Sequence, residues 1–448
     1  EGYTGCKRAV ARLAGAPPSD ARGLVLAQAL AWQANFAVEL TLFGEAHTLL
    51  DRSLSLLDAP TAQPAAPRLP ETELPGAEPL RAIVHYLLGR LGHLQSDVKQ
   101  ARPWLLSSLA LYQAQGDTAG TARALSMLGR LAWLAGDNAE AYDWYARSLA
   151  CYLALADVLG SILSLSDLAM LSALLDRHQH AEQLFEEAAA LAQALDDPIE
   201  AIKARRAIGM ALSNVGYNAA AVVQYETCLA IAEGCEHDYL RVENLVMLAF
   251  IRLMQCNYEQ ATVLGRQAFA LAERAHHRRD TGFALMLLGL AELGRGAYKT
   301  AHDLLRQCLA VYQVTNVADD QLFSLSGLSQ AQRGLGDTHG ARLTAKQALQ
   351  IAVQSRSFRA AGLALGAYIG VLLDEQQVER AVELEALLMR HPFGANSCFY
   401  QELNARPVAL YAARLPPEVV AAAKARGQTR DRLATLDEVW AELAPDPA

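Results

Sequence analysis

One alanine recurs every 40 residues along most of this 448-residue sequence. A small residue stands 12 positions before seven of the eight alanines, and a large apolar or aromatic residue comes one position earlier each time. A period this regular predicts a solenoid of repeated units, each of which buries its apolar face on its neighbour. The eight alanines are Ala101, Ala141, Ala181, Ala221, Ala261, Ala301, Ala341 and Ala381.

Each unit is interpreted as a pair of helices, called here helix A and helix B. In one unit the pattern of apolar residues predicts helix A over Thr121–Asp137 and helix B over Asn138–Leu155. Gly129 and Gly209, 12 positions before their alanines, are predicted to face helix B, where a Phe would cost about 1–3 kcal/mol. Glycines at one phase are predicted to end helix A in the left-handed conformation: Gly136, Gly216, Gly296 and Gly336.

This pattern resembles the tetratricopeptide repeat over about residues 80–390. The resemblance rests on the spaced small residues, on Asn or Tyr at the start of helix B, and on aromatic residues four positions after the alanine, such as Tyr145 and Tyr225. It implies an all-α fold, a right-handed α-α superhelix of about nine helical hairpins with a C-terminal helical cap. The period departs from the familiar 34 residues, and most units lack the boundary proline.

The longer units resemble the sensor arrays at the C-terminal end of STAND-type signalling ATPases, which include MalT-like and AfsR-like bacterial regulators. Two stretches strengthen this likeness. Leu30–Leu57 is similar to the first unit of such arrays, and Leu415–Leu443 is similar to their tail, a short helix, a break at "ARG" and a final acidic helix.

Four regions are expected along the chain. Residues 1–58 are N-terminal helical repeats, and residues 59–79 are a Pro-rich loop that interrupts the period. Residues 80–390 are eight tetratricopeptide-like repeats. Residues 391–448 abandon the period and are expected to cap the last repeat, because an open solenoid end exposes apolar surface.

Composition restricts the functional classes. A net charge of −9 argues against broad binding to nucleic acid, and no apolar run has the length of a membrane span. Seven cysteines without a CxxC predict free thiols in a reducing cytoplasm and no disulfides. Cys228 and Cys308 are expected to be small buried residues of helix B. The start of the sequence has no Met and no apolar signal core, so we expect a fragment of a longer cytoplasmic polypeptide.

No catalytic motif stands out. The sequence has no GxxxxGK[ST], GxSxG or HExxH, and Gly334–Gly340 is interpreted as a helix-joining turn rather than a dinucleotide fingerprint. His178, His180 and the pair at His276 and His277 are interpreted as solvated turn residues, since nothing supplies further metal ligands. We therefore predict no catalytic residue, no cofactor, no metal and no enzymatic activity in this chain.

Binding is predicted on the concave face, which the stacked A helices are expected to line. The early part of that face is expected to be cationic and aromatic, and its middle rich in Met and Phe, which suits a peptide or protein groove. The alternative is that the apolar members pack between helices and the arginines are merely solvated. The candidate residues are Tyr86, Arg90, Arg130, Trp133, Met170, Lys203, Arg206, Met210, Phe250 and Met286.

Three functions remain open from the sequence. The first is an effector-sensing array of a larger signalling ATPase or transcriptional regulator, which binds a protein, a peptide or a small-molecule effector. The second is a free-standing adaptor that assembles proteins. The third is the dimerisation part of a regulator whose DNA-binding module lies elsewhere, since no basic recognition helix stands out here.

Overall fold

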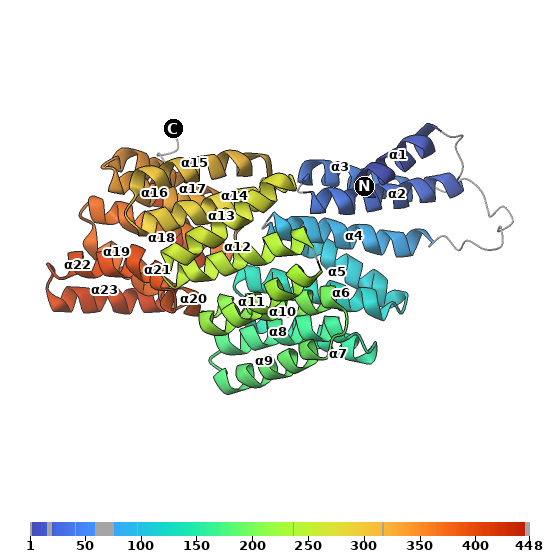
Figure 1. The fold of residues 1–448 in the computed structure, drawn as a ribbon, viewed down its shortest axis with the longest axis horizontal. Helices are drawn as coiled ribbons and strands as arrows, with labels where there is room; N and C mark the ends of the chain where they lie inside the picture. Colours follow the sequence, from blue (N-terminus) through green and yellow to red (C-terminus); the bar gives the residue numbers. More distant parts are fainter. Residues whose placement is uncertain are drawn as a thin grey trace.

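The structure is a computed structural model that describes residues 2–15, 20–40, 42–58, 76–95, 97–235, 237–315 and 318–443. Every regular element within these ranges is helical, as the sequence predicts (Figure 1). None of the described helices is long and apolar enough to cross a membrane. The chain therefore folds as an α-α superhelix built from helical hairpins.

Nine hairpins follow one another in the described part of the chain. In each, the first helix is helix A and the second is helix B, and most A helices also contact the A helix of the next hairpin. The hairpins are α2 (Asp20–Glu39) with α3 (Phe43–Asp58), α4 (Ala77–Leu94) with α5 (Val98–Ala114), α6 (Thr118–Ala135) with α7 (Asn138–Ala154), α8 (Val158–Leu174) with α9 (His178–Gln193), α10 (Pro198–Asn214) with α11 (Asn218–Gly234), α12 (Asp238–Met254) with α13 (Tyr258–Arg274), α14 (Arg278–Gly294) with α15 (Tyr298–Thr315), α16 (Ala318–Gly334) with α17 (Thr338–Ser355), and α18 (Phe358–Asp374) with α19 (Val378–Leu388).

The recurring alanine lies at the seam between the two helices of each hairpin. All eight alanines are 0% exposed. A Cβ atom on Gly129 would lie 2.9 Å from the ring of Tyr145, and one on Gly209 would lie 2.8 Å from the ring of Tyr225. Both predicted contacts between small residues of helix A and helix B are therefore confirmed, because only a missing side chain admits the aromatic ring.

Seven residues after the alanine, helix B carries a second small residue in seven of the eight units, and in four of them this residue makes a hydrogen bond across the hairpin. The side chain of this buried residue donates to a helix A carbonyl 26 positions earlier: Ser108 Oγ to Ala82 at 2.8 Å, Ser148 Oγ to Ala122 at 3.0 Å, and Cys308 Sγ to Gly282 at 3.1 Å. Cys228 Sγ makes the same, longer contact to Ile202. A short donor at this position satisfies the carbonyl and still lets the backbones approach.

The turns between helix A and helix B repeat one left-handed residue. Gly136, Gly216, Gly296 and Gly336 have φ between 77° and 87°, as predicted. The same phase is filled by Asp176, Cys256 and Gln376, each with a positive φ near 60°. These three turns keep the left-handed conformation but have a residue other than glycine there, which is uncommon.

The N-terminal region holds α1 (Gly2–Gly15) before the first hairpin. Helix α4 begins at Ala77, so the predicted boundary of the Pro-rich loop at residue 79 is too late by a few residues. Residues 59–75 of that loop lie outside the described residues. The early start follows from the N-terminal position of Pro79, which is tolerated in the first turn of a helix.

The C-terminal region packs against the last hairpins. Helix α23 lies on α19 (Figure 1). Helix α24 lies on α17 and α18. The predicted break at "ARG" is wrong: α23 continues through Gly427, and a Cβ atom there would clash with the carbonyl of Glu383. This glycine serves a close helix contact rather than a turn. The elements are α20 (Pro392–Ala395), α21 (Cys398–Tyr400), η1 (Gln401–Ala405), α22 (Arg406–Ala412), α23 (Pro417–Thr429) and α24 (Arg432–Leu443).

Candidate functional site on the A-helix face

The ten predicted binding residues lie on the A helices α4, α6, α8, α10, α12 and α14, and the surface that the sequence analysis expects them to share is called here the A-helix face. Three of those residues are arginines, and the fold gives each a carboxylate from a neighbouring hairpin. Arg90 of α4 forms an ion pair with Glu39 of α2, and Arg206 of α10 forms one with Glu243 of α12. These ion pairs reduce the cationic character that the sequence suggests for this face.

Arg130 of α6 also has a carboxylate from a neighbouring hairpin, Asp167 of α8, and it is more buried than Arg90 and Arg206. Burial lowers the pKa of its guanidinium, but Asp167 of α8 and Tyr145 of α7 outweigh burial, so the pKa is raised and the charge is retained. The carboxyl of Asp167 is itself buried, which raises its pKa against the opposing effect of Arg130. Arg130 is thus engaged between repeats.

The other seven candidates differ in how far they are exposed to solvent. Met170, Phe250 and Met286 are buried, with exposures of 2%, 5% and 0%. Tyr86 and Trp133 are half-buried, whereas Lys203 is exposed and Met210 is 40% exposed. The structure therefore leaves Trp133, Lys203 and Met210 accessible on α6 and α10.

A segment from beyond the last hairpin covers the middle of the A-helix face. This return segment, residues 391–402, runs from the end of α19 back to α10–α13. The ring of Phe393 stacks on Phe250 with centroids 6.2 Å apart and an interplanar angle of 9°. Asn396 Nδ2 donates to the carbonyl of Val215 at 3.2 Å. The sequence analysis expects residues 391–448 to cap the last repeat; in the structure part of this region, residues 393–402, also contacts α10–α13.

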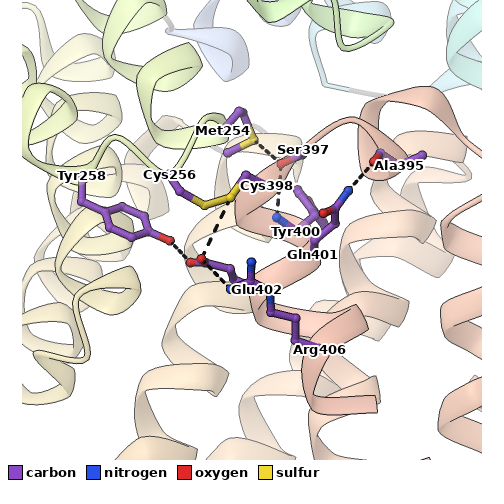
Figure 2. The surroundings of a disulfide bond; sticks show 10 residues. All are labelled: Met254, Cys256, Tyr258, Ala395, Ser397, Cys398, Tyr400, Gln401, Glu402 and Arg406. Atoms are coloured by element: carbon purple, nitrogen blue, oxygen red, sulfur yellow. Dashed lines mark hydrogen bonds and ion pairs between the residues drawn. A yellow bond between two sulfur atoms is a disulfide. The ribbon is translucent and has the colours of Figure 1, made fainter. Parts of the chain in front are cut away.

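A disulfide fastens the return segment to the array. Cys256, in the turn after α12, is bonded to Cys398 of α21, with Cα atoms 5.7 Å apart (Figure 2). Beside it, Glu402 accepts hydrogen bonds from the phenol of Tyr258 and from Arg406 Nη1, the latter at 3.0 Å. The prediction of no disulfide is wrong, because the two cysteines are 142 residues apart and meet only when the segment folds back.

The side chains of Cys256, Cys398 and Glu402 are spaced closely enough to hold a metal ion. The Sγ atoms of Cys256 and Cys398 and a carboxylate oxygen of Glu402 lie within 4.8 Å of one another. The two sulfurs are joined to each other in this structure, so the group acts as a covalent tie.

A shallow depression of about 550 Å³ opens where the return segment meets α11 and α12. Gly216, Asn218 and Met254 line it from the array, and Asn396 and Cys398 line it from the segment. Ser397 Oγ lies 3.3 Å from the sulfur of Met254 at its edge. The boundary between array and segment is therefore partly accessible.

The sequence reasoning missed Phe393, Asn396, Ser397 and Cys398, because these residues lie outside the period. One signal was present: Cys256 occupies the turn phase where Gly136, Gly216, Gly296 and Gly336 recur. A cysteine at a strained position that favours glycine indicates a role other than the turn.

Parts of the sequence match family models of the tetratricopeptide repeat. One model of the tetratricopeptide repeat matches residues 80–154 and 240–313, and another matches residues 161–195. The chain therefore carries a tetratricopeptide-repeat array, as predicted. No curated protein sequence matches the chain.

Several solved structures are similar in fold. A Rap protein complexed with competence and sporulation factor is 13% identical, with a TM-score of 0.51, over 93% of this chain and 99% of that chain. A STAND protein with a tetratricopeptide repeat sensor from Pyrococcus horikoshii is 14% identical, with a TM-score of 0.44, over 85% of this chain and 55% of that chain. The apo quorum sensor NprR from B. thuringiensis is 13% identical, with a TM-score of 0.45, over 73% and 88%. At these identities the likeness concerns the fold alone.

Proposed function

We propose that this chain is a non-catalytic scaffold that binds a peptide or protein on its A-helix face. One observation carries the proposal: the face already holds a peptide segment, residues 391–402, whose aromatic Phe393 stacks on Phe250. This surface packs an aromatic side chain of the same chain and accepts a hydrogen bond from the Asn396 amide beside it. Both are features of a peptide-binding groove.

The accessible half of the face is the place where a partner in trans would bind. Trp133, Lys203 and Met210 combine a large aromatic ring, an exposed cation and a flexible thioether, a composition typical of adaptable recognition surfaces. The Rap protein of similar fold was crystallised in complex with competence and sporulation factor, which supports a partner bound in trans.

The finer assignment is a sensor domain of a STAND-type ATPase or transcriptional regulator. In that role, effector binding across several repeats changes the superhelix and so alters a neighbouring ATPase module. A free-standing adaptor fits the same face equally well. The coding region upstream of Glu1 separates the two: a P-loop ATPase module supports the sensor, and a start codon close to Glu1 supports the adaptor.

Binding is tested with peptides selected from a displayed random library on the purified chain. We expect selected peptides to bind a Trp133→Ala/Lys203→Ala/Met210→Ala variant at least about tenfold more weakly, because anchor residues commonly contribute 1–2 kcal/mol each. Fluorescence anisotropy measures the affinity. The matched control is Leu343→Ala, which removes an apolar side chain that is 56% exposed on helix B of another hairpin.

The proposal fails if the library yields no specific peptide. It also fails if the triple variant and the wild type bind the selected peptides equally. A circular dichroism spectrum of each variant verifies that its helical content is unchanged.

A further inference from the structure

A buried arginine without a carboxylate lies where α24 begins. Arg432 is 7% exposed, and its guanidinium carbon lies 3.8 Å above the ring of Phe358 at the start of α18. Its Nη1 makes one long hydrogen bond, 3.4 Å, to the carbonyl of Phe358, and its buried Nε has no partner. Within the described ranges, no carboxylate lies at ion-pair distance from this side chain.

Two half-buried arginines of this chain are paired with carboxylates: Arg333 binds Asp374 at 2.7 Å, and Arg380 binds Glu383 at 2.7 Å. A third, Arg205, bonds to the amide oxygen of Gln224. An uncompensated charge in the interior is strongly destabilising, so a fold that pairs its arginines elsewhere would gain nothing by leaving Arg432 alone. The missing partner is therefore informative.

Further positive and neutral polar groups surround Arg432. Arg359, also at the start of α18, has its guanidinium 5.3 Å from the ring centroid of Phe323 and no carboxylate partner in the part of the chain that the structure describes. Burial, together with Arg432 and Arg359, lowers the pKa of His391 to about 3, so its imidazole is neutral. Burial raises the pKa of Tyr400 and both arginines oppose this rise, so its phenol keeps its proton.

The backbone adds to the positive field. At the N-terminus of α18, a 17-residue helix, Ser357 Oγ accepts a hydrogen bond from the N–H of Ala360, the first N–H groups have no acceptor within the helix, and the helix dipole has its positive end here. Burial, followed by the repulsion of Arg390, lowers the pKa of Arg432 to about 10, which still leaves it charged at neutral pH. The carboxylate of the adjacent Asp431 offsets part of this charge. The other charged side chains that act on Arg432 and on its neighbours His391 and Tyr400 are Arg359, Arg390 and Arg432.

We propose that Arg432, Arg359 and the first turn of α18 form a binding site for an oxyanion, the phosphate or carboxylate group of a small molecule. The two guanidiniums supply charge-assisted hydrogen bonds, and the phenol of Tyr400 and the imidazole of His391 supply neutral ones. This site is separate from the peptide-binding residues Trp133, Lys203 and Met210, and so goes beyond the proposed function.

The position of the site links two distant parts of the array. The ring of Phe358 lies against the turn between α6 and α7, where a Cβ atom on Gly136 would be 2.8 Å from the ring. An anion at the start of α18 therefore lies next to the contact between the third and the ninth hairpins. Its binding stabilises this contact, because it removes the repulsion among the cations beside it.

Isothermal titration of the full chain with pyrophosphate and, separately, with citrate tests the site, with sodium chloride matching the ionic strength. We expect saturable binding by the wild type and at least about a tenfold weaker affinity for Arg359→Gln and for Arg432→Gln. Tighter binding of pyrophosphate identifies a phosphate ligand, and tighter binding of citrate identifies a carboxylate. The control is Arg266→Gln, which removes an exposed arginine on α13 and should bind as the wild type does.

Two results would overturn the proposal: neither anion binds saturably, or the Arg359→Gln variant binds as tightly as the wild type. Because Arg359 is exposed, its variant stays folded and keeps the test decisive even if Arg432→Gln unfolds. Peptide binding is measured in parallel, so loss of anion binding alone leaves the proposed scaffold function standing.

Discussion

The A-helix face has an accessible part and a covered part, although one repeat builds both. On α6 and α10 it keeps Trp133, Lys203 and Met210 accessible, whereas on α12 and α14 Phe250 and Met286 are buried. At Phe250 the return segment contributes to the burial, because Phe393 stacks on its ring. A periodic sequence thus supplies equivalent positions, and a non-periodic segment changes the surroundings of one of them.

The most direct test of this comparison uses two residues at the same phase, 11 positions before their alanines. Phe250 is 5% exposed beneath Phe393, and Met210 is 40% exposed. We expect Phe250→Ala to lower the free energy of unfolding by about 3–5 kcal/mol and Met210→Ala to lower it by less than about 1 kcal/mol. Urea unfolding followed by circular dichroism measures both. Equal losses would mean that the two halves do not differ.

The second prediction concerns the cluster that holds the C-terminal helices. Glu383 is 4% exposed and accepts hydrogen bonds from Arg380, Arg426 and Arg430. Glu383→Ala leaves these arginines without their shared partner and should cost about 3–5 kcal/mol. Glu379→Ala, which removes one exposed partner of Arg426, should cost less than about 1 kcal/mol. Similar losses for the two variants would show that the cluster is not cooperative.

The third prediction isolates the covalent tie. Cys256→Ser should lower stability by about 2–4 kcal/mol, since the disulfide closes a long loop. Hydrogen exchange should quicken in residues 391–402 and around α12, and stay unchanged on α6. The control is Cys235→Ser, an exposed free thiol. A reductant should bring the wild type to the stability of Cys256→Ser; a persisting difference under reduction would assign the effect to the turn at residue 256 instead.

The fourth prediction addresses what the two halves share. Gly129 faces Tyr145, and Gly289 faces Leu305, where a Cβ atom would lie 2.7 Å from the side chain. We expect Gly129→Phe and Gly289→Phe each to lower the thermal midpoint and to cost about 1–3 kcal/mol, because both overpack the same seam. A tolerated substitution in one half alone would mean that the hairpins are not equivalent there.

Sequence reasoning succeeded where the contacts are local. The alanine period, the glycine turns and the small residues at the seam concern residues within about one repeat of each other, so their spacing encodes the packing. It was less informative for the charges. The sequence alone suggests that Arg90 and Arg206 make the face cationic. In the structure, the packing of successive A helices places Glu39 beside Arg90 and Glu243 beside Arg206.

By itself the sequence determined the helical hairpins, their number and the residues at their seams, because a 40-residue period leaves few other ways to bury the apolar stripes. Only the tertiary structure decided that residues 391–402 return to α10–α13, that Cys256 meets Cys398, and that Arg432 is buried without a carboxylate. These contacts join residues far apart in the chain. No local propensity or period records them, since they depend on how the superhelix brings its distant turns together.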